Sequence, residues 1–80
     1  MGEPEIYATL TEIFHDVFMR DDLQVGPELC SKQVAGWDSF KQIEIVMATE
    51  ERFKVRLSTR DLDSLQNVGD LVRVIQAKTN

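Results

Sequence analysis

Hydrophobic residues recur at spacings of three and four between residues 3 and 19. This period places them on one face of a helix, while the charged residues fall mostly elsewhere. Pro4 is compatible with a helix only in its first turn, and the early glutamates suit the positive end of the helix dipole. The pattern predicts one long amphipathic helix with a buried face made of Ile6, Leu10, Ile13, Phe14, Val17 and Phe18.

The helical period stops after this segment. Residues 20–38 collect turn-forming residues, among them Gly26, Pro27 and Gly36, and are predicted to form a long loop. A loop of this length in a compact domain needs anchors on the core. The apolar residues that could provide them are Leu23, Val25, Leu29 and Val34.

A second helical pattern covers residues 39–53 and has too many apolar positions for one narrow stripe. One face is predicted as core and contains Ile45, Val46, Thr49 and Phe53. The adjoining face contains Phe40, Ile43 and Met47. We interpret this second face as a partner surface or the mouth of an interior cavity, because methionine is adaptable and phenylalanine is a good anchor. The alternative is that both faces are core.

The remaining chain predicts two more helices. Ser58 and Asp61 have the spacing of a capping box, which predicts a short third helix over residues 59–64 that buries Leu62, with Leu65 as a second candidate. Asn67 is expected to cap a last helix in the same way. The buried stripe of that helix would be Val68, Leu71, Val72 and Ile75.

The final residues, 78–80, are polar and are expected to fray. Eighty residues, 42% of them apolar and 29% charged, suit one small folded domain covering residues 1–80. The predicted fold is therefore an all-α four-helix bundle, with three main helices, a short third helix and a long loop between the first two.

The net charge of the chain and its distribution limit the classes of binding partner that we expect. The formal net charge is −5, so a basic face for nucleic acid is not expected. Residues 1–38 hold eight acidic and two basic residues, and the remainder holds six acidic and seven basic ones. Basic partners are favoured, and we expect a monomer.

The single cysteine, Cys30, rules out an internal disulfide framework and fits a reducing, cytoplasmic compartment. No signal-like start and no apolar run of membrane-spanning length is visible. Cys30 and His15, without a third group to orient them, do not indicate a nucleophilic site. The chain also shows no metal-binding motif and no paired acid and base, so an enzyme is not expected.

The main candidate for chemistry is the start of the second predicted helix. Gly36, Asp38 and Ser39 stand where a polar loop gives way to the helical run. Free backbone N–H groups and the positive end of the helix dipole would favour a phosphate attached to the Ser39 oxygen. The simpler alternative is that Ser39 or Asp38 is an ordinary N-cap.

The stretch also resembles a known family. Asp38-Ser39-Phe40, followed by Ile43 to Ala48, Glu50-Glu51 and Phe53, is similar to the serine-bearing helix of acyl carrier proteins. The resemblance covers nearly the whole chain. It implies that a phosphopantetheinyl transferase moves 4'-phosphopantetheine from coenzyme A onto Ser39, with Asp38 helping recognition. The arm would carry acyl or aminoacyl thioesters to loading and processing enzymes, and the protein itself would catalyse nothing.

The resemblance also implies a docking face on the second helix, consisting of Phe40, Ile43, Glu44, Met47, Glu50 and Glu51. Several positions depart from the family pattern. Lys41 stands where an acid is common, Thr49 occupies a core position, and Trp37 replaces a small residue. We interpret Trp37 as a lid on the loop in preference to a direct acyl contact. The departures favour a dedicated polyketide, peptide or lipid pathway over housekeeping fatty-acid synthesis.

One other function remains open at the level of sequence. The chain could be a small helical protein–protein interaction domain without a prosthetic group. The apolar residues of the second face would then hold a partner helix, and Ser39 would be only a cap.

Overall fold

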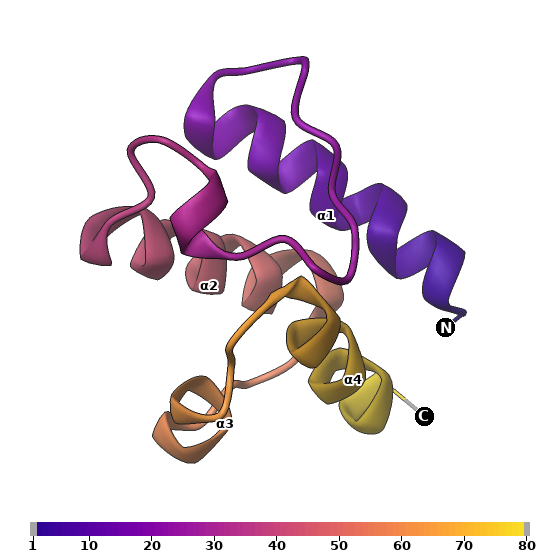
Figure 1. Cartoon of the computed structure of the whole chain (residues 1–80). Coiled ribbons are helices and arrows are strands. Elements are labelled where there is room, and N and C mark those ends of the chain that lie inside the picture. The colour runs from indigo at the N-terminus through magenta and orange to yellow at the C-terminus, as the bar shows by residue number, and fades with distance from the viewer. Residues whose placement is uncertain (1, 80) are drawn as a thin grey trace.

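The computed structural model describes residues 2–79, and this part of the chain contains four α-helices and no strand. The helices are α1 (Glu3–Phe18), α2 (Ser39–Phe53), α3 (Thr59–Asp63) and α4 (Val68–Thr79), and one 3-10 turn, η1, covers Ser31–Gln33. Figure 1 shows α1 and α2 lying side by side, with α3 set apart. The predicted all-α fold is confirmed. The single domain predicted over 1–80 includes Met1 and Asn80, which lie outside the described residues.

Helix α1 follows from its apolar period. Ile6, Leu10, Ile13 and Phe14 are buried, and Pro4 lies in the first turn as predicted. The helix ends one residue earlier than expected, because Met19 adopts a left-handed conformation (φ 53°) as its C-cap. The backbone N–H of Arg20 then donates to the His15 carbonyl at 3.1 Å, which satisfies one of the final carbonyl groups.

The core lies where α1 packs against both α2 and α4. Its apolar residues are Ile6, Leu10, Ile13, Phe14, Ile45, Phe53, Val68, Leu71, Val72 and Ile75. Thr49 is also fully buried, in agreement with its predicted place on the core face of α2. Val46, predicted on the same face, is only half-buried. Turning α2 toward α1 leaves Val46 at the side of the contact, where it lines a pocket.

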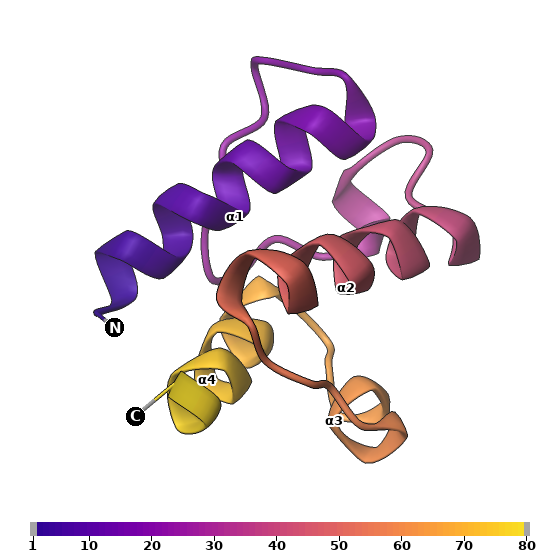
Figure 2. The ribbon, with the colours of Figure 1, turned by 180° about the vertical axis from the view of Figure 1, so that it is seen from behind.

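The long first loop is held by the anchors that the sequence predicts. Leu23, Val25 and Leu29 pack against the core, and Val34 is buried. The loop also completes α4: the Val68 N–H donates to the Leu29 carbonyl at 2.9 Å, and the next N–H donates to the Pro27 carbonyl. Figure 2 shows this loop passing behind the helices. The loop thus supplies partners for helix N–H groups that would otherwise have none.

Gly69 explains how closely the loop approaches α4. A Cβ atom at this position would lie 3.0 Å from the Pro27 carbonyl oxygen. With glycine here, the carbonyl accepts a hydrogen bond from the Gly69 N–H at 3.0 Å, whereas any other residue would force the Pro27 carbonyl to shift by a few tenths of an ångström.

The α3 capping box forms as predicted. Ser58 Oγ accepts from the Asp61 N–H, and an Asp61 carboxylate oxygen accepts from the Ser58 N–H. The Ser58 N–H and the Lys78 ammonium hold the pKa of Asp61 below its usual value. Two details differ from the prediction: α3 ends at Asp63, and Leu62 is only half-buried. Leu65, the second candidate, packs against the core. A helix of five residues at the edge of the molecule has no neighbour that could cover Leu62 fully.

Helix α4 begins at the predicted cap, because Asn67 Oδ1 accepts from the Asp70 N–H at 2.9 Å. The helix continues to Thr79. Lys78 pairs with Asp61 at 3.2 Å, and Thr79 donates to the Ile75 carbonyl. The fraying expected of residues 78–80 stays a prediction, and Asn80 lies outside the described part of the chain.

Candidate functional site

Ser39 is the first residue of α2, and Asp38 is the N-cap. Asp38 Oδ1 accepts from the Lys41 N–H at 3.0 Å, so the carboxylate and not the serine hydroxyl caps the helix. Gly36, with a φ of 86°, turns the chain just before this point. Ser39 is exposed, and its side chain stands at the positive end of a helix of 15 residues.

A shallow, open groove runs beside Ser39. It is lined by Ser31, Trp37, Asp38, Ser39, Gln42 and Ile43. Its walls come from η1, the end of the loop and the first turns of α2. The serine hydroxyl therefore faces a surface that combines polar groups with the edge of an indole ring.

Trp37 forms the inner wall of this groove. Its ring lies edge-on to Phe14, with centroids 5.3 Å apart, and also contacts Phe18 at 5.8 Å. The indole Nε1–H donates to Gln42 Oε1 at 2.8 Å. Trp37 therefore covers the aromatic end of α1, whereas the interpretation from the sequence is a lid on the loop. The partnership with Gln42 was not predicted, because two polar residues five positions apart give no local signal of contact.

The second face of α2 is open to solvent. The exposed fractions of Phe40, Ile43 and Met47 are 75%, 55% and 63%. The alternative that both faces of α2 are core is therefore wrong. Exposed apolar side chains that recur along one helix face are typical of an interaction surface.

The three glutamates of α2 differ in whether they have partners within the chain. Glu44 pairs with Lys41 at 3.4 Å, and Glu50 is half-buried and accepts from the Leu57 N–H at 3.0 Å. Glu51 is exposed. Two of the three carboxylates therefore have partners within the chain.

Lys41, which stands where the family pattern has an acid, has a structural role. Its Nζ donates to the Val17 carbonyl at 3.1 Å, near the C-terminal end of α1. A cation is favourable at that end of a helix dipole. Arg52 links the same two helices through Glu12, at 2.8 Å. The basic residues that dilute the acidic face thus connect α2 to α1.

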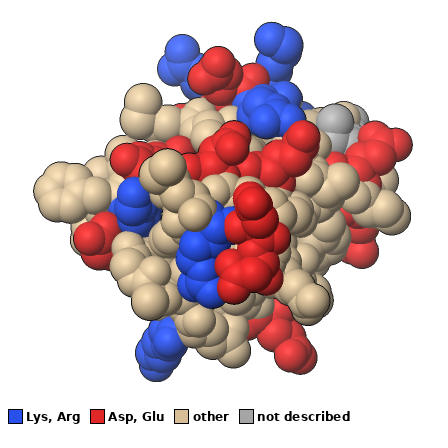
Figure 3. All heavy atoms as spheres, turned by 90° about the horizontal axis from the view of Figure 1, so that it is seen from above, with Lys and Arg blue, Asp and Glu red and all other residues tan. Residues whose placement is uncertain are grey.

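Figure 3 shows one further face of the molecule, on which acidic side chains are spread among basic ones. No basic patch dominates this view. Within residues 2–79, no group of three or more potential ligand side chains gathers to hold a metal ion. None of the helices in this part of the chain has both the length and the apolarity needed to cross a membrane.

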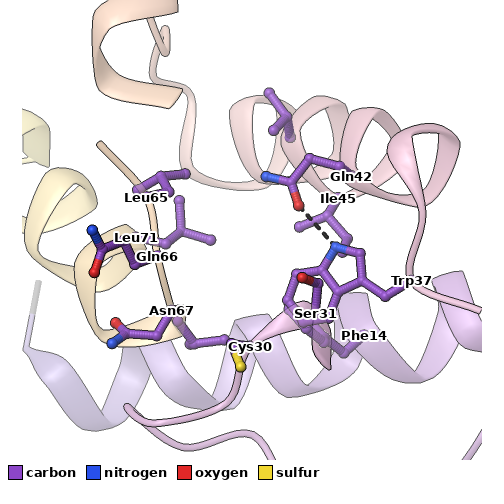
Figure 4. A pocket seen from close by; sticks show the side chains of 12 residues that line it. Phe14, Cys30, Ser31, Trp37, Gln42, Ile45, Leu65, Gln66, Asn67 and Leu71 are labelled. Carbon is purple, nitrogen blue, oxygen red and sulfur yellow. Dashed lines mark hydrogen bonds between the residues drawn. The ribbon is translucent and has the colours of Figure 1, made fainter. Parts of the chain in front are cut away.

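A partly open pocket of about 250 Å³ lies between α2, η1 and the start of α4 (Figure 4). Its lining includes the core residues Phe14, Ile45, Val68 and Leu71. Ser31, Trp37 and Gln42 belong to the lining of both the pocket and the groove. The sequence predicts a partner surface or a cavity mouth at Phe40, Ile43 and Met47, but none of these residues lines this pocket, which forms where three distant segments meet.

Comparison with known proteins agrees with this geometry. Residues 8–75 match the family described as "Phosphopantetheine attachment site". The meromycolate extension acyl carrier protein of Mycolicibacterium aurum is 35% identical over 75 residues, which cover 94% of this chain and 77% of that protein. The protein of the same name from Mycolicibacterium smegmatis is also 35% identical, over 92% of this chain and 75% of that one.

Among solved structures, the holo acyl carrier protein of Geobacter metallireducens has a TM-score of 0.85 and 29% identity. The match covers 90% of this chain and 83% of that protein. Fold, matched segment and relatives together define a phosphopantetheine-bearing carrier domain. The chain belongs to the acyl carrier protein family.

Membership of this family establishes what the protein does in general terms. It carries acyl intermediates on 4'-phosphopantetheine, does not catalyse, and interacts with a phosphopantetheinyl transferase and with biosynthetic enzymes. The match to a family of phosphopantetheine attachment sites disfavours the alternative of an interaction domain without a prosthetic group. The residues present fit the group, because an exposed serine hydroxyl with no capping duty stands at a helix N-terminus beside an open groove.

Proposed function

We propose that Ser39 is the residue that carries 4'-phosphopantetheine. The observation that supports this most is the division of roles at the start of α2: Asp38 caps the helix, and the neighbouring hydroxyl is exposed. A phosphodiester on this oxygen would lie close to the free N–H groups of the first helical turn. The bound arm supplies a terminal thiol that holds acyl groups as thioesters.

The attachment step assigns clear roles to the residues of this chain. The Ser39 oxygen forms the new bond to phosphorus and loses its proton, while the adenosine bisphosphate half of coenzyme A leaves. The transferase supplies the base. Asp38 adds a carboxylate beside the reacting oxygen, where the enzyme can recognise it.

The proposal extends to partners. Phe40, Ile43 and Met47 form an apolar ridge on α2, flanked by Glu44, Glu50 and Glu51, on which loading and processing enzymes would dock. The high exposure of the three apolar side chains supports this, together with their common helix face. Glu51 is the most available of the acidic groups, because Glu44 and Glu50 have partners within the chain.

The cargo belongs, on this proposal, to a fatty-acid-type or a specialised assembly pathway, and the protein acts as a cytoplasmic monomer that binds no nucleic acid. The relatives named for meromycolate extension support an acyl cargo of a dedicated lipid pathway. The Lys41–Glu44 ion pair and the hydrogen bond from the Leu57 N–H to Glu50 support the same proposal, since they leave few free acids on α2.

The test is intact mass spectrometry after co-expression with a broad-specificity phosphopantetheinyl transferase. We expect the wild-type chain to gain the mass of one phosphopantetheine group and Ser39→Ala to gain nothing. Ser31→Ala is the matched control, because Ser31 lines the same groove and is also exposed; it should be modified normally. An unmodified wild-type chain, or a modified Ser39→Ala chain, would contradict the proposal.

A further inference from the structure

Ser39 lies between two contacts that close the first turn of α2. One is the Asp38 cap, and the other joins Trp37 to Gln42, where the indole N–H donates to Oε1 at 2.8 Å. Trp37 stands just before the N-cap, and Gln42 is the fourth residue of the helix. In many helices these two positions hold a hydrophobic pair, the staple, which fixes the angle at which the chain enters the helix. Here a hydrogen bond joins them, and we call the Trp37–Gln42 pair the polar staple.

The polar staple is fixed to α1. The Trp37 ring lies edge-on to Phe14, with centroids 5.3 Å apart, and its centroid is 5.8 Å from that of Phe18. Phe14 is fully buried. Lys41 adds a second link, because its Nζ donates to the Val17 carbonyl at 3.1 Å. The turn that bears the serine therefore cannot rotate relative to α1 without breaking these contacts.

The angle of this turn decides where two backbone donors point. The N–H of Lys41 donates to the Asp38 carboxylate at 3.0 Å, and that of Gln42 donates to the Asp38 carbonyl at 2.9 Å. The N–H groups of Ser39 and Phe40 come before them in the chain, and a phosphate on the Ser39 oxygen would meet these two groups. A change in the entry angle would turn both donors and the oxygen away together.

The polar staple belongs to the site as well as to the packing of α1. Trp37, Gln42 and Ser39 line the same open groove, and the two side chains of the staple are half-buried. A tryptophan in such a place usually finds a partner for its N–H. Packing alone therefore accounts for a hydrogen bond, but it does not require a partner within the turn that bears the serine.

We propose that Trp37 and Gln42 are positioning residues for the attachment of 4'-phosphopantetheine. Their hydrogen bond holds the first turn of α2 so that the Ser39 oxygen meets the phosphorus of coenzyme A in line with the bond that breaks. The Ser39 oxygen bonds to phosphorus, the bond from phosphorus to the adenosine bisphosphate oxygen breaks, and the serine proton passes to the base of the transferase. Both residues act through the position of Ser39. This inference depends on the attachment at Ser39 proposed above.

The acceptor is removed by Gln42→Met and kept by Gln42→Glu. Methionine matches the helix propensity of glutamine but is only a weak acceptor, whereas a glutamate oxygen can still accept from the indole. Single-turnover modification at increasing transferase concentrations separates the rate within the bound complex from the half-saturating concentration. We expect Gln42→Met to lower this rate about tenfold, because a misplaced reacting atom costs rate, and to keep the half-saturating concentration within about twofold. Gln42→Glu should keep the wild-type rate.

The donor is tested by Trp37→Phe, which keeps an aromatic ring on Phe14 but lacks the N–H. This variant should also lose about tenfold in rate, and the double variant Trp37→Phe/Gln42→Met should be no slower than either single one, because both break the same bond. Trp37 is the only tryptophan of the chain, so its indole N–H resonance reports whether the bond forms in solution. The resonance should shift in Gln42→Met and stay near its wild-type position in Gln42→Glu.

Gln33→Met is the matched control. The Gln33 amide oxygen also accepts a hydrogen bond, from the Cys30 N–H at 3.2 Å, but this residue does not line the groove. The control should keep the wild-type rate.

Several results would overturn the proposal. They are a wild-type rate in folded Gln42→Met, an equal loss in Gln42→Glu, losses that add in the double variant, and an indole resonance that Gln42→Met leaves unmoved. A role in stability alone would give the first of these together with a lower melting temperature. Failure of the attachment proposal is distinguishable, because the wild-type chain would then gain no mass or Ser39→Ala would gain it.

Discussion

Asp38 and Ser39 illustrate how two adjacent residues divide the work at a helix start. Both can cap a helix, and the sequence alone left open which of them does so. In the structure the carboxylate of Asp38 accepts a hydrogen bond from the N–H of Lys41. The hydroxyl next to it is therefore available for a covalent bond, and modification of Ser39 would cost the helix no cap.

This division separates the two roles that we assign to Asp38. Asparagine caps a helix about as well as aspartate, whereas alanine does not. We expect Asp38→Asn to retain wild-type stability and to slow modification of Ser39, and Asp38→Ala to lose about 1 kcal/mol of unfolding free energy as well. Urea unfolding and initial rates with the transferase measure the two effects. A wild-type modification rate in Asp38→Asn would show that the charge has no part in recognition.

At the scale of the element, α2 serves three purposes on three sides. One side is core, one is the exposed ridge of Phe40, Ile43 and Met47, and one carries Gln42 toward the pocket. The sequence predicted the first two sides from periodicity. It could not show that Lys41 and Arg52 bridge to α1, because those contacts join residues 24 and 40 positions apart.

The exposed ridge leads to a prediction about how partners bind. Phe40→Ala and Met47→Ala should each lower kcat/KM of the transferase roughly five- to tenfold, because apolar anchors carry much of the binding energy in such contacts. Their effect on stability should stay within about 0.5 kcal/mol, since both side chains are mostly exposed. Steady-state modification kinetics and thermal unfolding are the measurements.

Arg73→Ala serves as the control, because it truncates a side chain that is 73% exposed on α4, away from the ridge. It should leave the kinetics unchanged. Raising the salt concentration should lower the rate only modestly, since Glu44 and Glu50 already have partners within the chain and Glu51 is the most available acid beside the ridge. A steep salt dependence together with wild-type kinetics of both alanine variants would indicate docking by charge instead.

At the scale of the whole molecule, one polar group stands out in the core that joins α1, α2 and α4. Thr49 is fully buried, and its hydroxyl oxygen has no hydrogen-bond partner among the described residues. An unsatisfied buried hydroxyl costs about 1–3 kcal/mol. The core is therefore less stable than its apolar packing alone would make it.

Replacing this hydroxyl should stabilise the protein. We expect Thr49→Val to raise the free energy of unfolding by about 1 kcal/mol, and the melting temperature by about 4–8 °C. Thr11→Val is the matched control, because the Thr11 hydroxyl donates to the Tyr7 carbonyl at 2.7 Å. The control should gain nothing. Equal changes in the two variants, measured by chemical and thermal unfolding, would mean that the Thr49 hydroxyl is satisfied in solution.

The sequence by itself determined the helices, most of their ends and the position of Ser39 at the start of α2. These features depend on local physics: the apolar period, the capping residues and the turn formers act over a few neighbouring positions. For the same reason the exposed face of α2 could be predicted from its spacing. Where the local signal was weak, as at Leu62, the prediction was wrong.

Only the tertiary structure decided which polar groups are free and where a cavity forms. In the folded chain Glu44 pairs with Lys41, and Glu50 accepts from the Leu57 N–H. Lys41 also donates to a carbonyl at the end of α1, and Trp37 donates to Gln42. The pocket exists because η1, α2 and the start of α4 meet without filling the space between them. Such contacts depend on the packing of segments far apart in the chain, and no pattern of neighbouring residues specifies them.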